Sequence, residues 1–153
     1  MPLRLKLAVA LGVFACAAGG VLVHSAPPEG GFRVIVGTSN PLTSVKRDDL
    51  ARIFLKKLTR SKDGQELSPV DQSARSAVRA AFSERVLVKE GLDKISAVEN
   101  YWRQQIYSGR GNPPSVKISD DEVRKFVAAT PGAIGYVGEK ADLTGVKAVT
   151  VQD

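Results

Sequence analysis

The chain is poor in the two residues that most often build metal sites and nucleophilic active sites. Its 153 residues include one cysteine and one histidine, Cys16 and His24, and both lie near the N-terminus. One cysteine cannot form an internal disulfide, and a zinc cluster or a Ser-His-Asp or Cys-His site needs further Cys or His residues. We therefore expect no enzyme activity, no metal and no cofactor.

The chain also lacks a dense run of basic residues and a basic motif interleaved with aromatic residues. Lys and Arg nevertheless outnumber Asp and Glu by 22 to 16. A nucleic-acid-binding domain normally concentrates its basic residues in a patch or stripe, so we expect no nucleic-acid partner. The mild basic excess instead favours small anions, polyanions or a membrane surface.

The first 25 residues have the pattern of a signal peptide. Arg4 and Lys6 precede an apolar run over residues 7–23, and small residues follow it. Cleavage after Ser25 would remove two basic residues and leave a net charge of +4, which is 20 basic minus 16 acidic residues. Two alternatives stay open: an uncleaved membrane anchor, since the run is at the lower limit for a spanning helix, and lipidation at Cys16. Each route exports the domain, so we expect a periplasmic or otherwise exported protein, membrane-anchored in the alternative.

The remainder divides into a linker over residues 26–31 and one domain over residues 32–153. Its composition, 43% hydrophobic and 25% charged for the whole chain, is typical of a globular protein. Apolar periodicity predicts strands over residues 32–36, 66–70, 133–137 and 146–151. It predicts helices over residues 47–57, around residues 78–86, over residues 92–106 and between residues 119 and 130. Alternating strands and helices indicate an α/β fold, a single layered domain with about four helices packed on a small sheet.

Two helices carry specific signals. Ser119 and Glu122 have the spacing of a capping box, in which Glu122 would accept the backbone N–H of Ser119. Trp102 lies on the apolar stripe that Val98 and Ile106 share, so we expect it in the core rather than in a ligand site.

The stretch over residues 69–82 is the strongest candidate for a binding site. It reads as the end of a strand, a polar turn and a helix, and Ser73, Arg75 and Ser76 gather where the helix begins. The first turn of a helix has unpaired N–H groups and partial positive charge, so it can hold an anion. The alternative is that Ser76 is only an N-cap, which would contribute about 1 kcal/mol to stability.

Over roughly 100 residues the chain resembles the phosphate-binding proteins of ABC transporters, in the type 2 periplasmic-binding superfamily. It is most similar to their short, single-lobe bacterial relatives, and the segment PGAIGYV over residues 131–137 is the most distinctive part. The other matching pieces, in chain order, are Asn40-Pro41, Arg47-Asp48-Asp49-Leu50, Ile53-Phe54-Leu55, Pro69-Val70, Ser76 with Phe82, Tyr101-Trp102 and Ser108-Gly109. The resemblance implies one lobe of a two-lobed binding protein.

The resemblance also implies where an anion would bind, and the chain departs from the family there. The family's ligand set contains an arginine, an aspartate and a Ser-Gly-Thr sequence at a helix N-terminus. Ser76 matches the serine, whereas Gln72, Ala74, Ala77 and Val78 stand for the arginine, the aspartate, the glycine and the threonine. A replacement positive charge would have to come from the neighbouring arginine at position 75.

Two functions follow as expectations. The first is an exported solute-binding-like protein that works with a membrane transporter and weakly binds phosphate or another oxyanion, through Ser39, Asn40, Arg75, Ser76 and Arg110. The second is an interaction module that has kept the lobe, lost the ligand and docks on a membrane transporter or another envelope protein.

Overall fold

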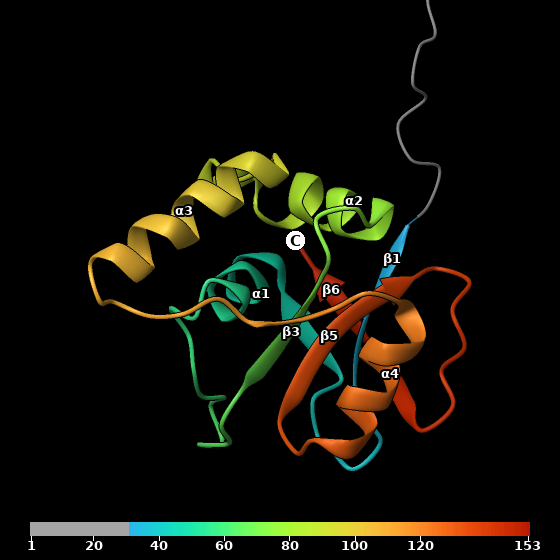
Figure 1. Ribbon diagram of the computed structural model, residues 1–153. Coiled ribbons are helices and arrows are strands. Elements are labelled where there is room, and N and C mark those ends of the chain that lie inside the picture. The colour runs from blue at the N-terminus through green and yellow to red at the C-terminus, as the bar shows by residue number, and fades with distance from the viewer. Residues whose placement is uncertain (1–30) are drawn as a thin grey trace, which may run out of the picture.

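The computed structural model describes residues 31–153, which form one α/β unit with four α-helices and a six-stranded sheet (Figure 1). The predicted signal peptide over residues 1–25 and the predicted linker, apart from Gly31, lie outside the described residues. Within this part of the chain, no helix has the length and apolar character needed to cross a membrane.

The sheet is mixed, with the strand order β2-β6-β1-β5-β3-β4. The strands are β1 (Phe32–Gly37), β2 (Ser44–Lys46), β3 (Ser68–Gln72), β4 (Ser115–Lys117), β5 (Ala133–Gly138) and β6 (Val146–Gln152). β1 runs antiparallel to both of its neighbours, β5 and β6, whereas β3 runs parallel to β5. The start of β1 therefore lies beside the ends of β3 and β5. We call this end of the sheet the upper end, as it is drawn in Figure 1.

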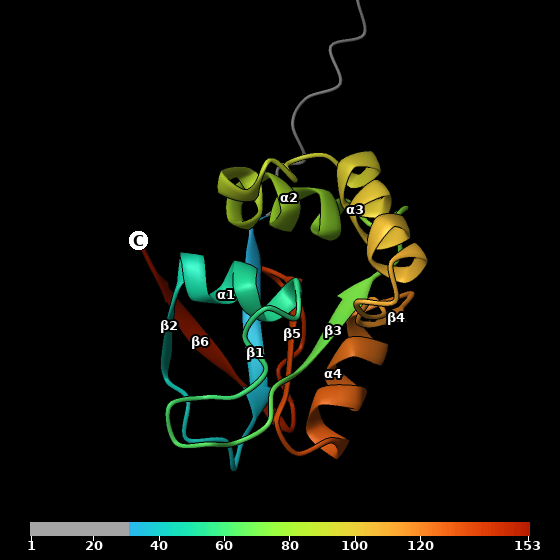
Figure 2. The same ribbon diagram turned by 90° about the vertical axis from the view of Figure 1, so that its left-hand side faces the viewer.

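Helices cover both faces of the sheet (Figure 2). They are α1 (Arg47–Phe54), α2 (Ala77–Val86), α3 (Ile95–Tyr107) and α4 (Asp120–Ala129), with a 3-10 turn at Val88–Glu90. Side chains alternate between the faces along β1: Val34 and Val36 belong to the core cluster under α1, α2 and α3, and Ile35 belongs to the cluster under α4. The fold is thus three layers with two apolar cores on one sheet.

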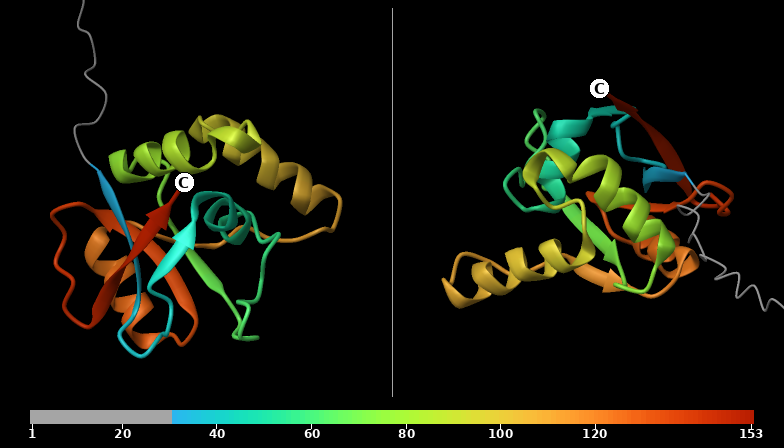
Figure 3. Two further views of the ribbon diagram at one scale, coloured as in Figure 1. Left: turned by 180° about the vertical axis from the view of Figure 1, so that it is seen from behind. Right: turned by 90° about the horizontal axis from the view of Figure 1, so that it is seen from above.

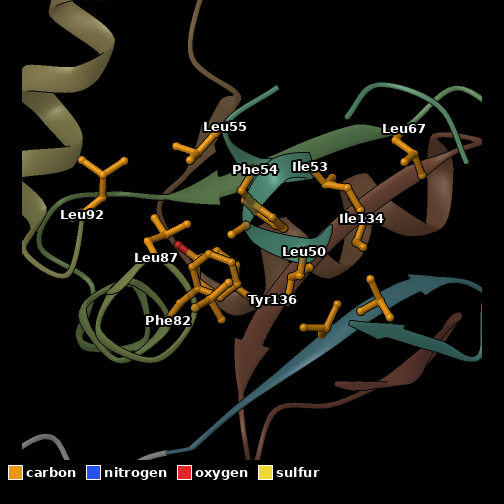
Figure 4. Close-up of a cluster of buried hydrophobic side chains, with 14 of the residues drawn as sticks. Leu50, Ile53, Phe54, Leu55, Leu67, Phe82, Leu87, Leu92, Ile134 and Tyr136 are labelled. Atoms are coloured by element: carbon orange, nitrogen blue, oxygen red, sulfur yellow. The ribbon is translucent and has the colours of Figure 1, made fainter. Parts of the chain in front are cut away.

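The larger of the two cores contains packed aromatic side chains among aliphatic ones (Figure 4). The rings of Phe82 and Tyr136 stack with their centroids 4.1 Å apart, and Phe54 packs against both. Trp102 is only 7% exposed and belongs to the same cluster, which confirms its predicted place in the core. The aromatic stack fixes α2 over the upper end of the sheet, where the candidate site lies.

The predicted α/β fold is confirmed, with all four helices and the four predicted strands within a few residues of their expected bounds. Two strands, β2 and β4, were not predicted. Each has only three residues, which is too few to show the alternation of apolar and polar residues that indicates a strand. α1 ends at Phe54 rather than at position 57, and Lys56 adopts a left-handed conformation (φ 53°) after it. The second half of the predicted capping box is wrong: Glu122 accepts the N–H of Ile118, at 3.1 Å, instead of that of Ser119.

Candidate functional site

The start of α2 meets the ends of β3 and β5 in a network of polar side chains. Gln72, the last residue of β3, is only 2% exposed. Its amide nitrogen donates to Oδ1 of Asp120 at 2.8 Å and to the carbonyl oxygen of Tyr136 at 3.0 Å. Its amide oxygen accepts the hydroxyl of Ser76 at 2.6 Å. The Gln72 side chain thus joins α2, α4 and β5.

Ser76 is the N-cap of α2. Its backbone is extended (φ −75°, ψ 125°), and its Oγ accepts the N–H of Arg79 at 3.3 Å while its hydroxyl proton goes to Gln72. Ser76 therefore has the N-cap role that the sequence offered as the alternative to a ligand contact. Its hydroxyl group already takes part in two hydrogen bonds inside the protein, as a donor in one and as an acceptor in the other. A ligand contact by Ser76 stays a prediction, and it would have to replace one of these hydrogen bonds.

Asp120 brings a carboxylate to this upper end of the sheet. It is the first residue of α4, and its Oδ2 accepts the backbone N–H of Gly138 at 3.0 Å. Negative charge at the first turn of a helix is favourable, so Asp120 stabilises α4 where it stands. The same charge opposes a second anion beside Gln72.

A buried ion pair lies one residue further back along β3. The Asp71 carboxylate pairs with Nη2 of Arg79 at 3.1 Å. It also accepts hydrogen bonds from the hydroxyl of Tyr136 and from the backbone N–H of Gln72, the latter at 2.8 Å. Burial raises the pKa of Asp71, and the Arg79 guanidinium, the Tyr136 hydroxyl and the Gln72 N–H offset only part of that effect. Burial and the Asp71 carboxylate together raise the pKa of Tyr136 above its ordinary value. The positive charge of Arg79 is therefore already paired with the Asp71 carboxylate.

The five predicted ligand residues do not lie around one site. Arg75 and Ser76 are neighbours at the upper end of the sheet, with Arg75 exposed. Ser39 and Asn40 follow β1, which runs the other way, so they lie at the lower end. There Asn40 is used locally: its Oδ1 accepts the N–H of Leu42 at 2.9 Å. Arg110 follows α3, which projects away from the sheet (Figure 3).

The sequence interpretation missed the polar residues that hold this region together: Asp71, Arg79, Asp120 and Tyr136. Most of these contacts join distant parts of the chain: Asp71 and Tyr136 are 65 positions apart, and Gln72 and Asp120 are 48 positions apart. One signal was available: Asp71 and Gln72 are polar residues that directly follow the strand predicted over residues 66–70, and polar groups that become buried require hydrogen-bond partners.

The chain matches no protein-family model, and no curated protein is similar to it in sequence. Its structure, however, is similar to several solved structures. One is an ABC-type phosphate transport receptor from Vibrio cholerae, with a TM-score of 0.59 and 20% sequence identity over 80% of this chain. A second is PstS from Borrelia burgdorferi, with a TM-score of 0.56 and 18% identity over 81% of this chain.

A third similar structure, from Clostridium perfringens, is described as a phosphate ABC transporter substrate-binding protein with bound phosphate; it gives a TM-score of 0.61 and 22% identity over 80% of this chain. The chain spans 45–48% of the length of these three proteins. At this level of identity the likeness shows the fold alone. The predicted resemblance to one lobe of such proteins is thus confirmed as a resemblance of fold.

Proposed function

We propose that this chain is a solute-binding-like lobe that acts as an interaction module in the cell envelope, on a membrane transporter or another exported protein, and does not enclose phosphate. The observation that carries the proposal is the Gln72 amide, which is hydrogen-bonded to Ser76 at 2.6 Å and to Asp120 at 2.8 Å. The place where the resemblance puts an anion is thereby filled by the chain's own side chains.

Electrostatics at this place also oppose an anion. A phosphate beside Ser76 would compete with Gln72 for its hydroxyl and would meet the carboxylate of Asp120, which raises the free energy of a second negative charge. The nearest buried guanidinium, that of Arg79, is already paired with Asp71 at 3.1 Å. Taking Arg79 from that pair would leave Asp71 as an unpaired buried charge, which is strongly unfavourable.

Weak binding of phosphate or another oxyanion is the second candidate, and the exposed guanidinium of Arg75 beside the start of α2 supports it. A charge-assisted hydrogen bond contributes about 1.5–3 kcal/mol, and a helix N-terminus adds about 0.3–1 kcal/mol. Their sum stays near or below the roughly 4.1 kcal/mol of a 1 mM dissociation constant. Arg75 therefore supports millimolar binding at best.

Export to the envelope is part of the proposal and depends on the signal-peptide pattern over residues 1–25. The fold supports it in one respect: the similar structures include an ABC-type phosphate transport receptor and PstS.

Titration calorimetry with phosphate and with sulfate, up to on the order of 10 mM, separates the two candidates. We expect no saturable heat with the native protein, and the same result with Arg75→Ala. We expect Ser76→Ala to lose about 0.5–2 kcal/mol of stability as a cap variant. Saturable heat that disappears in Arg75→Ala would establish the oxyanion site and overturn the proposal.

A further inference from the structure

An elongated trough runs along β2 at the edge of the sheet opposite β4. It consists of two adjoining hollows of about 440 Å³ and about 170 Å³, which share Leu42, Ser44 and Leu67 among their walls. One wall is the stretch over residues 41–46 with the start of α1, and the other is the loop over residues 58–67. Figure 2 shows β2, α1 and this loop on the same side of the molecule.

The floor of the trough is apolar. Leu42 and Leu58 are half-buried, and beneath them lie Val45, Ile53 and Leu67, which are buried in the larger core. A side chain that enters the trough therefore meets a continuation of the core. In a typical interface, a few side chains that are fully buried in such a hollow supply most of the affinity.

The rim of the trough is cationic. It carries the four basic residues Lys46, Arg52, Arg60 and Lys62 and the two acidic residues Asp49 and Asp63. Arg52 contacts Asp49 at 3.4 Å, and Arg60 donates to the backbone oxygen of Gly64 at 3.1 Å. Across residues 31–153, no ion pair is found for Lys46, Arg60 or Lys62. This rim complements carboxylates.

The backbone of β2 is free on the trough side. β2 is the last strand of the sheet order and pairs only with β6, among the strands that the structure describes. The N–H of Thr150 donates to the carbonyl oxygen of Thr43 at 3.0 Å. Successive residues of a strand direct their backbone groups to opposite sides, so Ser44 directs its N–H and C=O away from β6. An unpaired edge can pair with another strand, here over the three residues of β2.

We propose that an extended segment of a partner protein, in which apolar residues alternate with Asp or Glu, binds in this trough as an additional strand beside β2. Its backbone pairs with Ser44, its apolar side chains contact Leu42 and Leu58, and its carboxylates face Lys46 and Lys62. This is β-strand addition, in which backbone hydrogen bonds give affinity and alternate side chains give specificity. The inference rests on the proposed interaction-module function and names the chemistry of its partner.

The test uses the full chain and a fluorescein-labelled peptide of Glu-Val-Asp-Leu repeats, with binding followed by fluorescence anisotropy. We expect saturable binding that weakens as salt is added, and none by a peptide in which Lys replaces each acid. The double variant Lys46→Glu/Lys62→Glu should bind about tenfold or more weakly, because two favourable charge contacts become repulsive. The matched control Arg85→Glu/Lys140→Glu, on α2 and after β5 at the upper end of the sheet, should bind like the native protein.

Ser44→Pro tests the backbone part of the proposal. Proline removes the outward N–H of Ser44 but no hydrogen bond to β6, and an edge strand tolerates it. We expect weaker peptide binding with Trp102 fluorescence unchanged, so that loss of fold is distinguished from loss of the contact. Absence of peptide binding by the native chain, or equal binding by the trough variants and the control, would overturn the proposal.

Crosslinking in cells distinguishes failure of the trough from failure of the module. A protein partner that the native chain captures and Lys46→Glu/Lys62→Glu loses supports the trough. A partner that Lys46→Glu/Lys62→Glu still captures would refute binding in the trough but would agree with the proposed interaction-module function. Saturable phosphate binding with no partner captured refutes both.

Discussion

One amide decides how the upper end of the sheet is occupied. Gln72 stands where the resemblance would place an arginine, and it accepts from Ser76 and donates to Asp120. A guanidinium has only donors, so an arginine at this position would leave the Ser76 hydroxyl proton without its acceptor. The amide has both a donor and an acceptor, and it therefore closes the network without a ligand.

Two opposing effects act on the pKa of Asp71: burial raises it, and the ion pair with Arg79 lowers it. Its folded-state pKa is raised, mainly by burial, above the value of about 3.9 expected when unfolded. The folded state then binds the proton more tightly, so its stability should rise as pH falls from the folded pKa towards about 3.9. With Asp71→Asn as the non-titrating reference, we expect the native-minus-variant difference in unfolding free energy to grow over that range. Urea denaturation at several pH values measures it.

Asp121 provides the control, because its pKa is shifted the other way. Hydrogen bonds from Lys125 and Arg124 lower the pKa of Asp121 in the folded state. The contribution of Asp121 to stability is therefore present above about pH 3.9 and is lost as pH falls below that value. Asp121→Asn should therefore leave the slope above about pH 4 unchanged. A difference for Asp71 that shrinks on acidification would mean that the Arg79 charge outweighs burial.

At the scale of elements, β5 is a strand against which a helix packs closely. Gly135 has no side chain, and a Cβ built there would lie 2.7 Å from Cγ1 of Val70 and 2.8 Å from Cγ1 of Val123. Both neighbours are β-branched and stiff, so they cannot move away easily. The glycine at position 135 is thus what allows α4 to approach the sheet.

We expect Gly135→Ala to lower the free energy of unfolding by about 1–3 kcal/mol through overpacking. Gly37→Ala is the matched control, because it also lies in a strand below α4 and its Cβ would meet the Val127 carbonyl oxygen at an ordinary 3.5 Å. Denaturant midpoints of the two variants test this. Equal midpoints would show that α4 can shift to admit the methyl group.

At the scale of the whole molecule, the two cores share one sheet. Trp102 lies in the larger core, and Val123 lies in the smaller core on the other face. The strands between them contribute alternate side chains to both, as Val34 and Ile35 do in β1. Loss of either core should therefore unfold the whole described unit.

We expect Val123→Ala to shift the unfolding midpoint seen by Trp102 fluorescence and the midpoint seen by far-UV circular dichroism by the same amount. The loss of two buried methyl groups corresponds to roughly 1.5–3 kcal/mol. Since the chain has a single tryptophan, its fluorescence reports on the face opposite the substitution. A fluorescence midpoint that stays in place while the dichroism midpoint moves would show that the two faces unfold separately.

The sequence alone determined the properties that depend on neighbouring residues. The helices followed from apolar spacing, the N-caps Ser76 and Ser119 from their places before helices, and the core position of Trp102 from its stripe. Alternation of strands and helices was enough to predict the α/β class. These properties are local, because a helix or strand buries the face that its own residues present.

Tertiary structure alone decided the strand order, the strand directions and every contact between distant residues. β1 runs antiparallel to β5, which places Ser39 and Asn40 at the end of the sheet away from Ser76. The partnership of Asp71 with Tyr136 and the free edge of β2 arise in the same way. A strand's own residues specify which face it buries, but its neighbour in the sheet depends on how the whole chain packs.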